Sequence, residues 1–251
     1  MAEGKVALVT GGSRGIGAAI VRGLAKDGYR PVFSYHQRRD EADALCAGLQ
    51  QQGCGALALS CDVADPVQVD RLVADTLRIC GRIDVLVNNA GVHVPNVSFA
   101  DLKDADWQHV LEVNLTAPFR LARAVVPVMR KQGGGHIVNL SSNVTQRMPA
   151  GYGVYAVSKA GLEAFTRILA KEEGRHGIRV NGVGPGPIRT DMLQQSLDAL
   201  GAEKAQGFMQ SIVMQRMGEP EEIASVVSFL LSGAASYMTG QVVYVNGGGV
   251  M

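Results

Sequence analysis

The segment KVALVTGGSRGIG, residues 5–17, joins a short apolar run to a glycine-rich turn, and a helical pattern begins at Ala18. Gly11, Gly15 and Gly17 have the spacing Gly-x-x-x-Gly-x-Gly. Glycine lets the backbone turn sharply and approach a pyrophosphate, and the free N–H groups at a helix start favour negative charge. Strand, glycine turn and helix in this order predict a dinucleotide-binding loop, although a lone turn of this kind could also serve only to pack helix on strand.

Six further apolar runs follow at intervals typical of alternating strands and helices. We expect strands at residues 31–35, 56–60, 83–87, 136–140, 178–183 and 241–245. Helical patterns lie between them, at residues 41–52, 66–79, 104–130, 153–172 and 220–231. Such alternation implies right-handed crossovers and a parallel sheet covered on both faces. The sequence therefore predicts an α/β fold, a single Rossmann-like domain over residues 1–251 with a doubly wound, seven-stranded parallel sheet.

Composition excludes several classes of function. Of 251 residues, 47% are hydrophobic and 19% are charged, and the net charge of +1 gives no reason to expect nucleic acid or an acidic membrane surface as partner. The four cysteines lack Cys-x-x-Cys spacing and partner histidines, so we expect reduced thiols and no metal. The N-terminal MAEGK leads directly into a strand, and no apolar run could span a bilayer. We expect a cytoplasmic protein.

The end of the second predicted strand bears on the choice of cofactor. A carboxylate there would bind the ribose 2′-hydroxyl of NAD, but no Asp or Glu occurs between Asp27 and Asp40. The segment contains Arg38 and Arg39 instead, and Arg14 lies in the glycine turn. Because guanidinium groups match a 2′-phosphate, this pattern favours NADP(H). If Arg38 and Arg39 only begin a solvated helix, Arg14 alone must carry the preference.

Residues 142–159 contain side chains suited to carbonyl chemistry. Tyr155 and Lys159 stand four apart in a helical pattern, so they share a face of the helix. A nearby ammonium favours the phenolate, and we expect Lys159 to lower the pKa of Tyr155. Ser142 follows a predicted strand, and its hydroxyl could bond the same carbonyl oxygen. Tyrosine and lysine also occur four apart by chance, so the pair needs its context to indicate catalysis.

Two further stretches are notable. Asn114 is a polar residue inside an apolar run, and we expect its side chain to bond a backbone carbonyl or hold a water. The run GPGPIRTDM, residues 184–192, predicts an open turn at the carboxyl edge of the sheet, suited to lie against a nicotinamide. The weak pattern around residues 190–215 is consistent with a substrate lid or with an ordinary pair of surface helices.

These motifs together resemble the short-chain dehydrogenase/reductase family, and most closely its 3-oxoacyl-acyl-carrier-protein reductase branch. They occur in family order over nearly the whole chain: TGGSRGIG, CDV, NNAG, the asparagine of EVNLTAPF, LSS, YAVSK, GPGPIRTDM and YMTGQVVYVNGG. Any one of them could arise by chance, whereas eight in register are very specific.

The resemblance implies roles for individual residues. Tyr155 would donate the proton, Ser142 would orient the carbonyl, and Lys159 would hold the nicotinamide ribose and tune Tyr155, while Asn114 would complete a water relay. Ser142 is preferred because its distance from Tyr155 along the sequence matches the family pattern, and Ser141 is the alternative. Asp62 is expected at the adenine and residues 89–91 at the adjoining ribose. The expected cofactor contacts are Gly11, Ser13, Arg14, Gly15, Ile16, Gly17, Tyr35, Arg38, Asp62, Val63, Asn89, Ala90, Gly91, Tyr155, Lys159, Pro185, Gly186, Ile188 and Thr190.

The resemblance also implies partners. A homotetramer would form through the two long helices and the last strand. Acyl-carrier-protein docking would use a basic pair, whose positions here hold Gly133 and His176, with Lys131 and Arg175 adjacent.

We therefore expect an NADPH-dependent carbonyl reductase that acts without a metal or a covalent intermediate. A 3-oxoacyl thioester is the leading substrate, and a small free ketone or a steroid-like or sugar-like secondary alcohol is the alternative. Met148, Met192 and Leu193 suggest an apolar side to the pocket, although they could equally be core residues. A protein that binds NADPH and signals its level without turnover is the remaining possibility. The intact set of Asn, Ser, Tyr and Lys argues against it.

Overall fold

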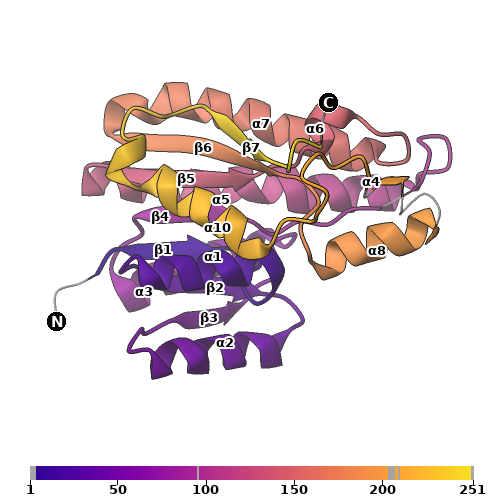
Figure 1. Ribbon diagram of the computed structural model, residues 1–251. Coiled ribbons are helices and arrows are strands. Elements are labelled where there is room, and N and C mark those ends of the chain that lie inside the picture. Colours follow the sequence, from indigo (N-terminus) through magenta and orange to yellow (C-terminus); the bar gives the residue numbers. More distant parts are fainter. Residues whose placement is uncertain (1–3, 95, 203–206, 209, 250–251) are drawn as a thin grey trace.

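The apolar runs pair into one sheet in the computed structural model, which describes residues 4–94, 96–202, 207–208 and 210–249. All its pairings are parallel, in the order β3-β2-β1-β4-β5-β6-β7 (Figure 1). The strand bounds are β1 (Val6–Val9), β2 (Arg30–Tyr35), β3 (Leu57–Ser60), β4 (Val85–Asn88), β5 (Gly135–Leu140), β6 (Ile178–Pro185) and β7 (Val242–Val245). The order reverses between β1 and β4, and ligands of such sheets bind at the carboxyl ends of strands near that point. The predicted fold class is confirmed.

Helices cover both faces of the sheet. Buried side chains of α3, α5 and α7 pack on one face, and those of α1, α2 and α10 pack on the other. The helix bounds are α1 (Gly15–Lys26), α2 (Arg39–Gln51), α3 (Pro66–Cys80), α4 (Asp104–Leu111), α5 (Ala117–Gln132), α6 (Val144–Arg147), α7 (Gly153–Glu173), α8 (Asp191–Leu200) and α10 (Pro220–Leu231). In the part of the chain that the structure describes, no helix is long and apolar enough to cross a membrane.

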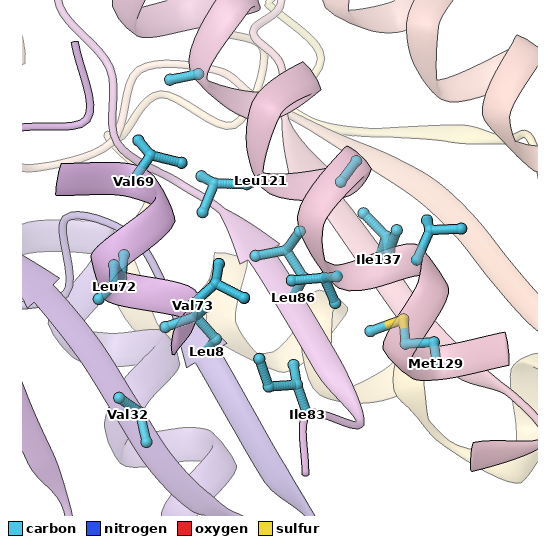
Figure 2. Packing of buried hydrophobic residues seen from close by; sticks show 14 of the residues in the cluster. Leu8, Val32, Val69, Leu72, Val73, Ile83, Leu86, Leu121, Met129 and Ile137 are labelled. Atoms are coloured by element: carbon cyan, nitrogen blue, oxygen red, sulfur yellow. The ribbon is translucent and has the colours of Figure 1, made fainter. Parts of the chain in front are cut away.

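Figure 2 shows the core beneath α3 and α5. Leu72 and Val73 of α3 and Met129 of α5 lie over Leu8 and Leu86 of the central strands, and all five side chains are buried. Strands of a parallel sheet bury both faces, which explains why these runs are continuously apolar and do not alternate.

Helix starts follow the local rules that the sequence suggested, with one exception. Asp65 caps α3 by accepting a hydrogen bond from the N–H of Val67 at 2.8 Å, and Pro66 occupies the first turn. Helix α1, however, begins at Gly15 and not at Ala18, because Ala18 N–H already donates to the Arg14 carbonyl at 3.1 Å. The glycine turn is therefore partly the first turn of the helix.

The long helix predicted over residues 104–130 is wrong in its middle. Helix α4 passes into a π-helical turn, Glu112–Thr116, before α5 begins. Pro118 contributes to this break, because it has no N–H to donate to the carbonyl of Asn114 four residues earlier. A π turn places one extra residue in the helix, and such turns are frequent at functional sites. Asn114 lies in this turn and is fully buried.

Helix α7 exposes part of its apolar surface. Ile168 is 57% exposed, and Phe165 is only partly buried. The buried face instead includes the charged residues Lys159, Glu163 and Glu173. Two of these belong to the site described below, and Glu173 joins α7 to α5. Arg130 donates two hydrogen bonds to its carboxylate, at 2.8 and 2.5 Å, and these bonds lower the pKa of Glu173.

We predict that Glu173→Gln lowers the free energy of unfolding at pH 7 and that this loss fades in acid. The pKa of Glu173 is below its usual 4.5 in the folded state, so the carboxylate stabilises the fold above that pH. The stabilisation is lost as the pH falls through the lower, folded-state pKa. Urea unfolding of both proteins from pH 7 to pH 3 measures the difference.

The exposed neighbour Glu172, changed to Gln, provides the matched control and should behave like the unmodified protein. A Glu173→Gln deficit that stays constant down to pH 3 would mean that the ion pair is not its cause.

Candidate active site

The glycine-rich turn between β1 and α1 has the shape of an anion cradle. Gly11 and Gly15 have positive φ angles of 64° and 51°, which favour glycine. A Cβ at Gly17 would lie 2.1 Å from the Gly11 carbonyl oxygen, so only glycine lets the helix start approach the turn this closely. Helix α1 has no acidic residue in its first turn and no side-chain cap. Its free N–H groups and positive dipole end therefore fit a pyrophosphate.

Three side chains hold this turn in place, and Asn89 is the one among them that the sequence had indicated as a site residue. Asn89 donates its amide hydrogens to the carbonyls of Thr10 and Gly11 at 2.9 and 3.0 Å. The hydroxyl of Thr10 accepts hydrogen bonds from the backbone N–H groups of Asn89 and Ala90, both at 3.0 Å. Ser34, on β2, accepts one from Gly11 N–H at 3.1 Å. The side chain of Asn89, expected to contact a ribose, is thus engaged in bracing the turn.

The other expected cofactor contacts lie in loops at the same edge of the sheet. Tyr35 ends β2, Asp62 and Val63 follow β3, and Asn89, Ala90 and Gly91 follow β4. Pro185 ends β6, two residues later than the predicted strand at 178–183, and Gly186 to Thr190 form the turn behind it. That turn reaches the glycine turn, because a Cβ at Gly15 would lie 3.3 Å from Cγ2 of Thr190. The structure therefore brings both ends of the expected dinucleotide site together.

The arginines expected at a 2′-phosphate are exposed and each contacts an acid. Arg14 pairs with Asp191 at the start of α8. Arg38 lies 3.2 Å from Glu41, and Arg39 lies 3.6 Å from Asp43 within the same helix. The last two contacts are what a solvated helix start would show, whereas Arg14 links the glycine turn to a different segment. Exposed pairs of this kind are weak, so an anionic ligand could displace them.

Ser142 and Tyr155 face each other where β5 ends. Tyr155 lies in the first turn of α7, and the neighbouring Ser142 hydroxyl acts to lower its pKa. The Ser142 hydroxyl also accepts a hydrogen bond from Val144 N–H at 3.2 Å. Ser141 points elsewhere, donating to Glu163 at 2.7 Å. The geometry thus pairs Tyr155 with Ser142 and not with the alternative serine.

Lys159 shares the predicted face of α7 with Tyr155 but has a different effect from the one expected. Its ammonium is 5.8 Å from the centre of the Tyr155 ring and donates to the Leu140 carbonyl at 2.7 Å. Burial lowers the pKa of Lys159 to about 8. The pKa of Tyr155 is raised, with burial as the largest cause, while the Ser142 hydrogen bond acts to lower it. The expectation that Lys159 lowers the pKa of Tyr155 is therefore wrong for this structure, because burial of the phenol raises the pKa and Lys159 is not among the groups that shift it.

Asn114 makes the backbone contact that its sequence context predicted. Its amide donates to the Val92 carbonyl at 2.8 Å and to the Ser158 hydroxyl at 3.0 Å, and its oxygen accepts from Val92 N–H at 2.9 Å. A Cβ at Gly91 would lie 3.4 Å from both the Asn114 oxygen and the Lys159 nitrogen. Gly91 therefore lies beside both polar groups, and the π turn fixes the loop after β4 next to Lys159.

His93 lies beside Tyr155 and belongs to none of the motifs in the sequence. Its ring lies edge-on to Tyr155, with centroids 6.0 Å apart, and stacks on Tyr152 at 6.4 Å. Its Nε2 is 2.9 Å from the Ser196 hydroxyl on α8, and burial lowers the pKa of the imidazole. Neutral imidazole can therefore hold α8 over the side of the site that carries Tyr155.

Helix α8 covers the first part of the expected lid segment, residues 190–215. It has no buried residue, and polar contacts such as Asn96 to the Ala199 carbonyl at 3.3 Å attach it to the loop after β4. Figure 1 shows α8 at one end of the molecule, apart from the helices that cover the sheet. Residues 203–206 and 209 of the segment, including Met209, lie outside the described residues.

Side chains at this edge suit an organic cofactor. Among the described residues, no group of three or more His, Cys, Asp or Glu side chains could hold a metal ion. The cradle that a Cβ would fill, the uncapped helix start and the cation at Arg14 together fit a dinucleotide phosphate.

Comparison with known proteins places this geometry in a family. The family model described as Enoyl-(Acyl carrier protein) reductase matches residues 11–249. A 3-oxoacyl-[acyl-carrier-protein] reductase of Synechocystis sp. is 42% identical over 248 residues, which cover 98% of this chain and 97% of the relative. Dehydrogenase/reductase SDR family member 4 of Pongo abelii is 39% identical over 97% of this chain and 87% of its own.

Solved structures agree with these relatives. A short-chain dehydrogenase/reductase from Serratia marcescens is 36% identical with a TM-score of 0.91, and the match covers 99% of both chains. A blue fluorescent protein from a metagenomic library, solved in complex with NADPH, is 38% identical with a TM-score of 0.91 over 98% of both chains. With the turn, the Ser142–Tyr155 contact and these matches in agreement, the chain belongs to the short-chain dehydrogenase/reductase family of oxidoreductases, which act on CH–OH and C=O groups with a nicotinamide cofactor.

Proposed function

We propose that this protein is an NADPH-dependent carbonyl reductase in which Tyr155 donates the proton. The observation that carries the proposal is the closeness of Tyr155 to Ser142, whose hydroxyl acts on the pKa of the phenol, at the carboxyl edge of the sheet that also holds the glycine turn. The contact brings two hydroxyl groups together where one carbonyl oxygen could meet both.

The raised pKa of Tyr155 suits a donor in the reductive direction. Burial keeps the phenol protonated at neutral pH, so the proton is available when negative charge develops on the substrate oxygen. Ser142 would donate a second hydrogen bond to that oxygen, which fixes its orientation and stabilises the developing charge. The cofactor supplies the hydride when bound.

Lys159 and Asn114 would support this donor. With a pKa of about 8, Lys159 is mainly an ammonium at neutral pH and could hold ribose hydroxyls in addition to the Leu140 carbonyl. Asn114 keeps the loop containing Gly91 and Val92 beside that ammonium. We propose these four residues as the catalytic set, with the water relay through Asn114 as part of it.

Charge supports NADPH over NADH. The segment at the end of β2 carries Arg38 and no acid that could bind a 2′-hydroxyl, and Arg14 lies at the start of α1. A structural neighbour was solved with NADPH. The remaining proposed contacts are the loop residues named above, with Asp62 at the adenine and Asn89 to Gly91 at the ribose.

A 3-oxoacyl thioester is the proposed substrate, because the Synechocystis relative is a 3-oxoacyl-[acyl-carrier-protein] reductase. A carrier protein would approach a surface hollow at the ends of α5 and α7, where Lys171 and Arg175 lie beside Arg130. Glu172 and Glu173 line the same hollow and reduce its positive charge. Because the hollow carries both positive and negative charge, a small free ketone is the second candidate substrate.

We also propose a cytoplasmic homotetramer. Phe119 of α5 and Ile168 of α7 are exposed apolar residues on the two long helices, and Phe119 contacts Phe165 edge to face. Tyr237 is fully exposed before β7, the last strand at the edge of the sheet. Exposed apolar side chains that gather in this way mark surfaces for association.

Tyr155→Phe should keep NADPH affinity and lose about 10²-fold to 10⁴-fold in kcat, because only the proton donor is removed. The assay follows the loss of nicotinamide absorbance with a panel of 3-oxoacyl thioesters and free ketones. Tyr29→Phe, just before β2 and at the opposite edge of the sheet from the site, is the control. Unchanged turnover in the Tyr155 variant would remove Tyr155 from its role. Failure of the unmodified protein to reduce any member of the panel would leave the sensor hypothesis.

Replacing Arg14 and Arg38 together by Gln should weaken NADPH binding by at least about tenfold and leave NADH nearly unaffected, since only NADPH carries the 2′-phosphate. Fluorescence titration with each dinucleotide measures the affinities. Arg22→Gln, an exposed arginine on α1, controls for net charge. An equal loss for both dinucleotides would refute the charge argument.

A further inference from the structure

A buried acid one turn beyond Lys159 has no part in the proposed mechanism. Glu163 lies on α7, and its side chain is only 7% exposed. Its Oε1 accepts hydrogen bonds from the hydroxyls of Ser141 and Thr145, both at 2.7 Å, and of Tyr244 at 2.8 Å. Its Oε2 is 3.2 Å from the guanidinium of Arg167. A buried carboxylate with this many donors is costly to remove and defines where each donor must lie.

The three hydroxyls come from separate parts of the chain. Ser141 follows β5, Thr145 lies in α6, and Tyr244 lies on β7. Gly184, opposite Tyr244 in the sheet, makes room for the tyrosine, because a Cβ there would lie 2.4 Å from the ring. One oxygen atom of Glu163, on α7, is therefore hydrogen-bonded both to β7 and to the turn between β5 and α6.

Ser142 lies inside the segment that this acid holds. Ser141 precedes it directly, and Thr145 follows three residues later, so both ends of the turn are bonded to Glu163. The Thr145 hydroxyl is also 2.9 Å from the Ser142 carbonyl oxygen. The backbone that carries the Ser142 hydroxyl is therefore fixed on both sides by one carboxylate.

The spacing of polar residues along α7 also fixes the end of β5. Tyr155, Lys159 and Glu163 stand four residues apart, so they follow one stripe of the helix that faces β5. Lys159 bonds the Leu140 carbonyl, and Glu163 bonds the next residue, Ser141. Successive turns of α7 therefore hold successive residues of the strand end that leads to Ser142.

We propose that Glu163 is a positioning residue that fixes the Ser142 hydroxyl against Tyr155. The inference rests on the proposed function, since Ser142 matters only if it binds the carbonyl oxygen. Glu163 touches neither Ser142 nor Tyr155 directly and acts through Ser141 and Thr145.

A double-mutant cycle with ketone as substrate tests this role. Glu163→Gln removes the charge that directs three hydroxyls, and it should lower kcat by about tenfold or more through misplacement of Ser142. NADPH affinity and binding stoichiometry, measured by fluorescence, should not change. In a Ser142→Ala background the same substitution should have little further effect, because its path of action is already removed.

Two controls accompany the cycle. Glu221→Gln changes an exposed glutamate on α10 and should leave kcat unchanged. Thr145→Val removes one hydroxyl at nearly constant volume and should reproduce part of the Glu163→Gln effect. It replaces Glu163→Gln in the cycle if circular dichroism shows that the glutamine variant does not fold.

The outcomes separate the two proposals. If Ser142→Ala has no effect, or the unmodified protein reduces no ketone, the proposed function fails and the positioning role fails with it. Either of two results overturns the positioning role alone. In the first, Ser142→Ala lowers kcat but Glu163→Gln does not. In the second, Glu163→Gln lowers kcat by the same factor in the Ser142→Ala background as in the unmodified protein. If only the positioning role is overturned, Glu163 is a residue that stabilises the fold and does not position Ser142.

Discussion

One buried hydrogen bond sets the geometry of the proposed site: the bond from the Lys159 ammonium to the Leu140 carbonyl at 2.7 Å. Lys159 is 3% exposed, and a buried cation requires a partner. Leu140 ends β5 two residues before Ser142, and Tyr155 lies one helical turn before Lys159. When the ammonium finds its carbonyl, α7 is fixed along β5 and the hydroxyls of Tyr155 and Ser142 meet.

Other polar groups buried at the same edge add to this constraint. Asn88 of β4 donates to Asn139 of β5, and Asn139 donates to Thr166 of α7, both at 2.8 Å. These bonds run from the centre of the sheet to the helix that carries Tyr155. On the other side, Asn89 and Thr10 tie the loop after β4 to the glycine turn. Because the side-chain donors of these asparagines are bonded to specific acceptors, the loops that form the site have little freedom to rearrange.

Much of the fold followed from the sequence, because continuous apolar strands, glycine turns and caps such as Asp65 are local signals. The π turn could not be predicted, because one extra residue in a helix changes the spacing of apolar residues too little to be detected in runs this short. The direction of the Tyr155 pKa was wrong because four-residue spacing reports a neighbour and not the depth of burial.

The proposed site residues were mostly selected from motifs, and most of the residues added from the structure belong to no motif. Glu163 did carry a signal, an acid four residues after Lys159 on the same face, whereas His93 is positioned only by a loop and by α8. Thr10 and Ser34 brace the glycine turn from positions that look like ordinary strand residues.

The most direct measurement of the central claim is a crystal structure of the protein with NADP⁺ bound. The account predicts the nicotinamide ring between the Pro185–Thr190 turn and Tyr155, with the Ser142 and Tyr155 hydroxyls on one side of it and Lys159 at its ribose. A dinucleotide bound away from the glycine turn, or a ring separated from Tyr155 by other side chains, would contradict it.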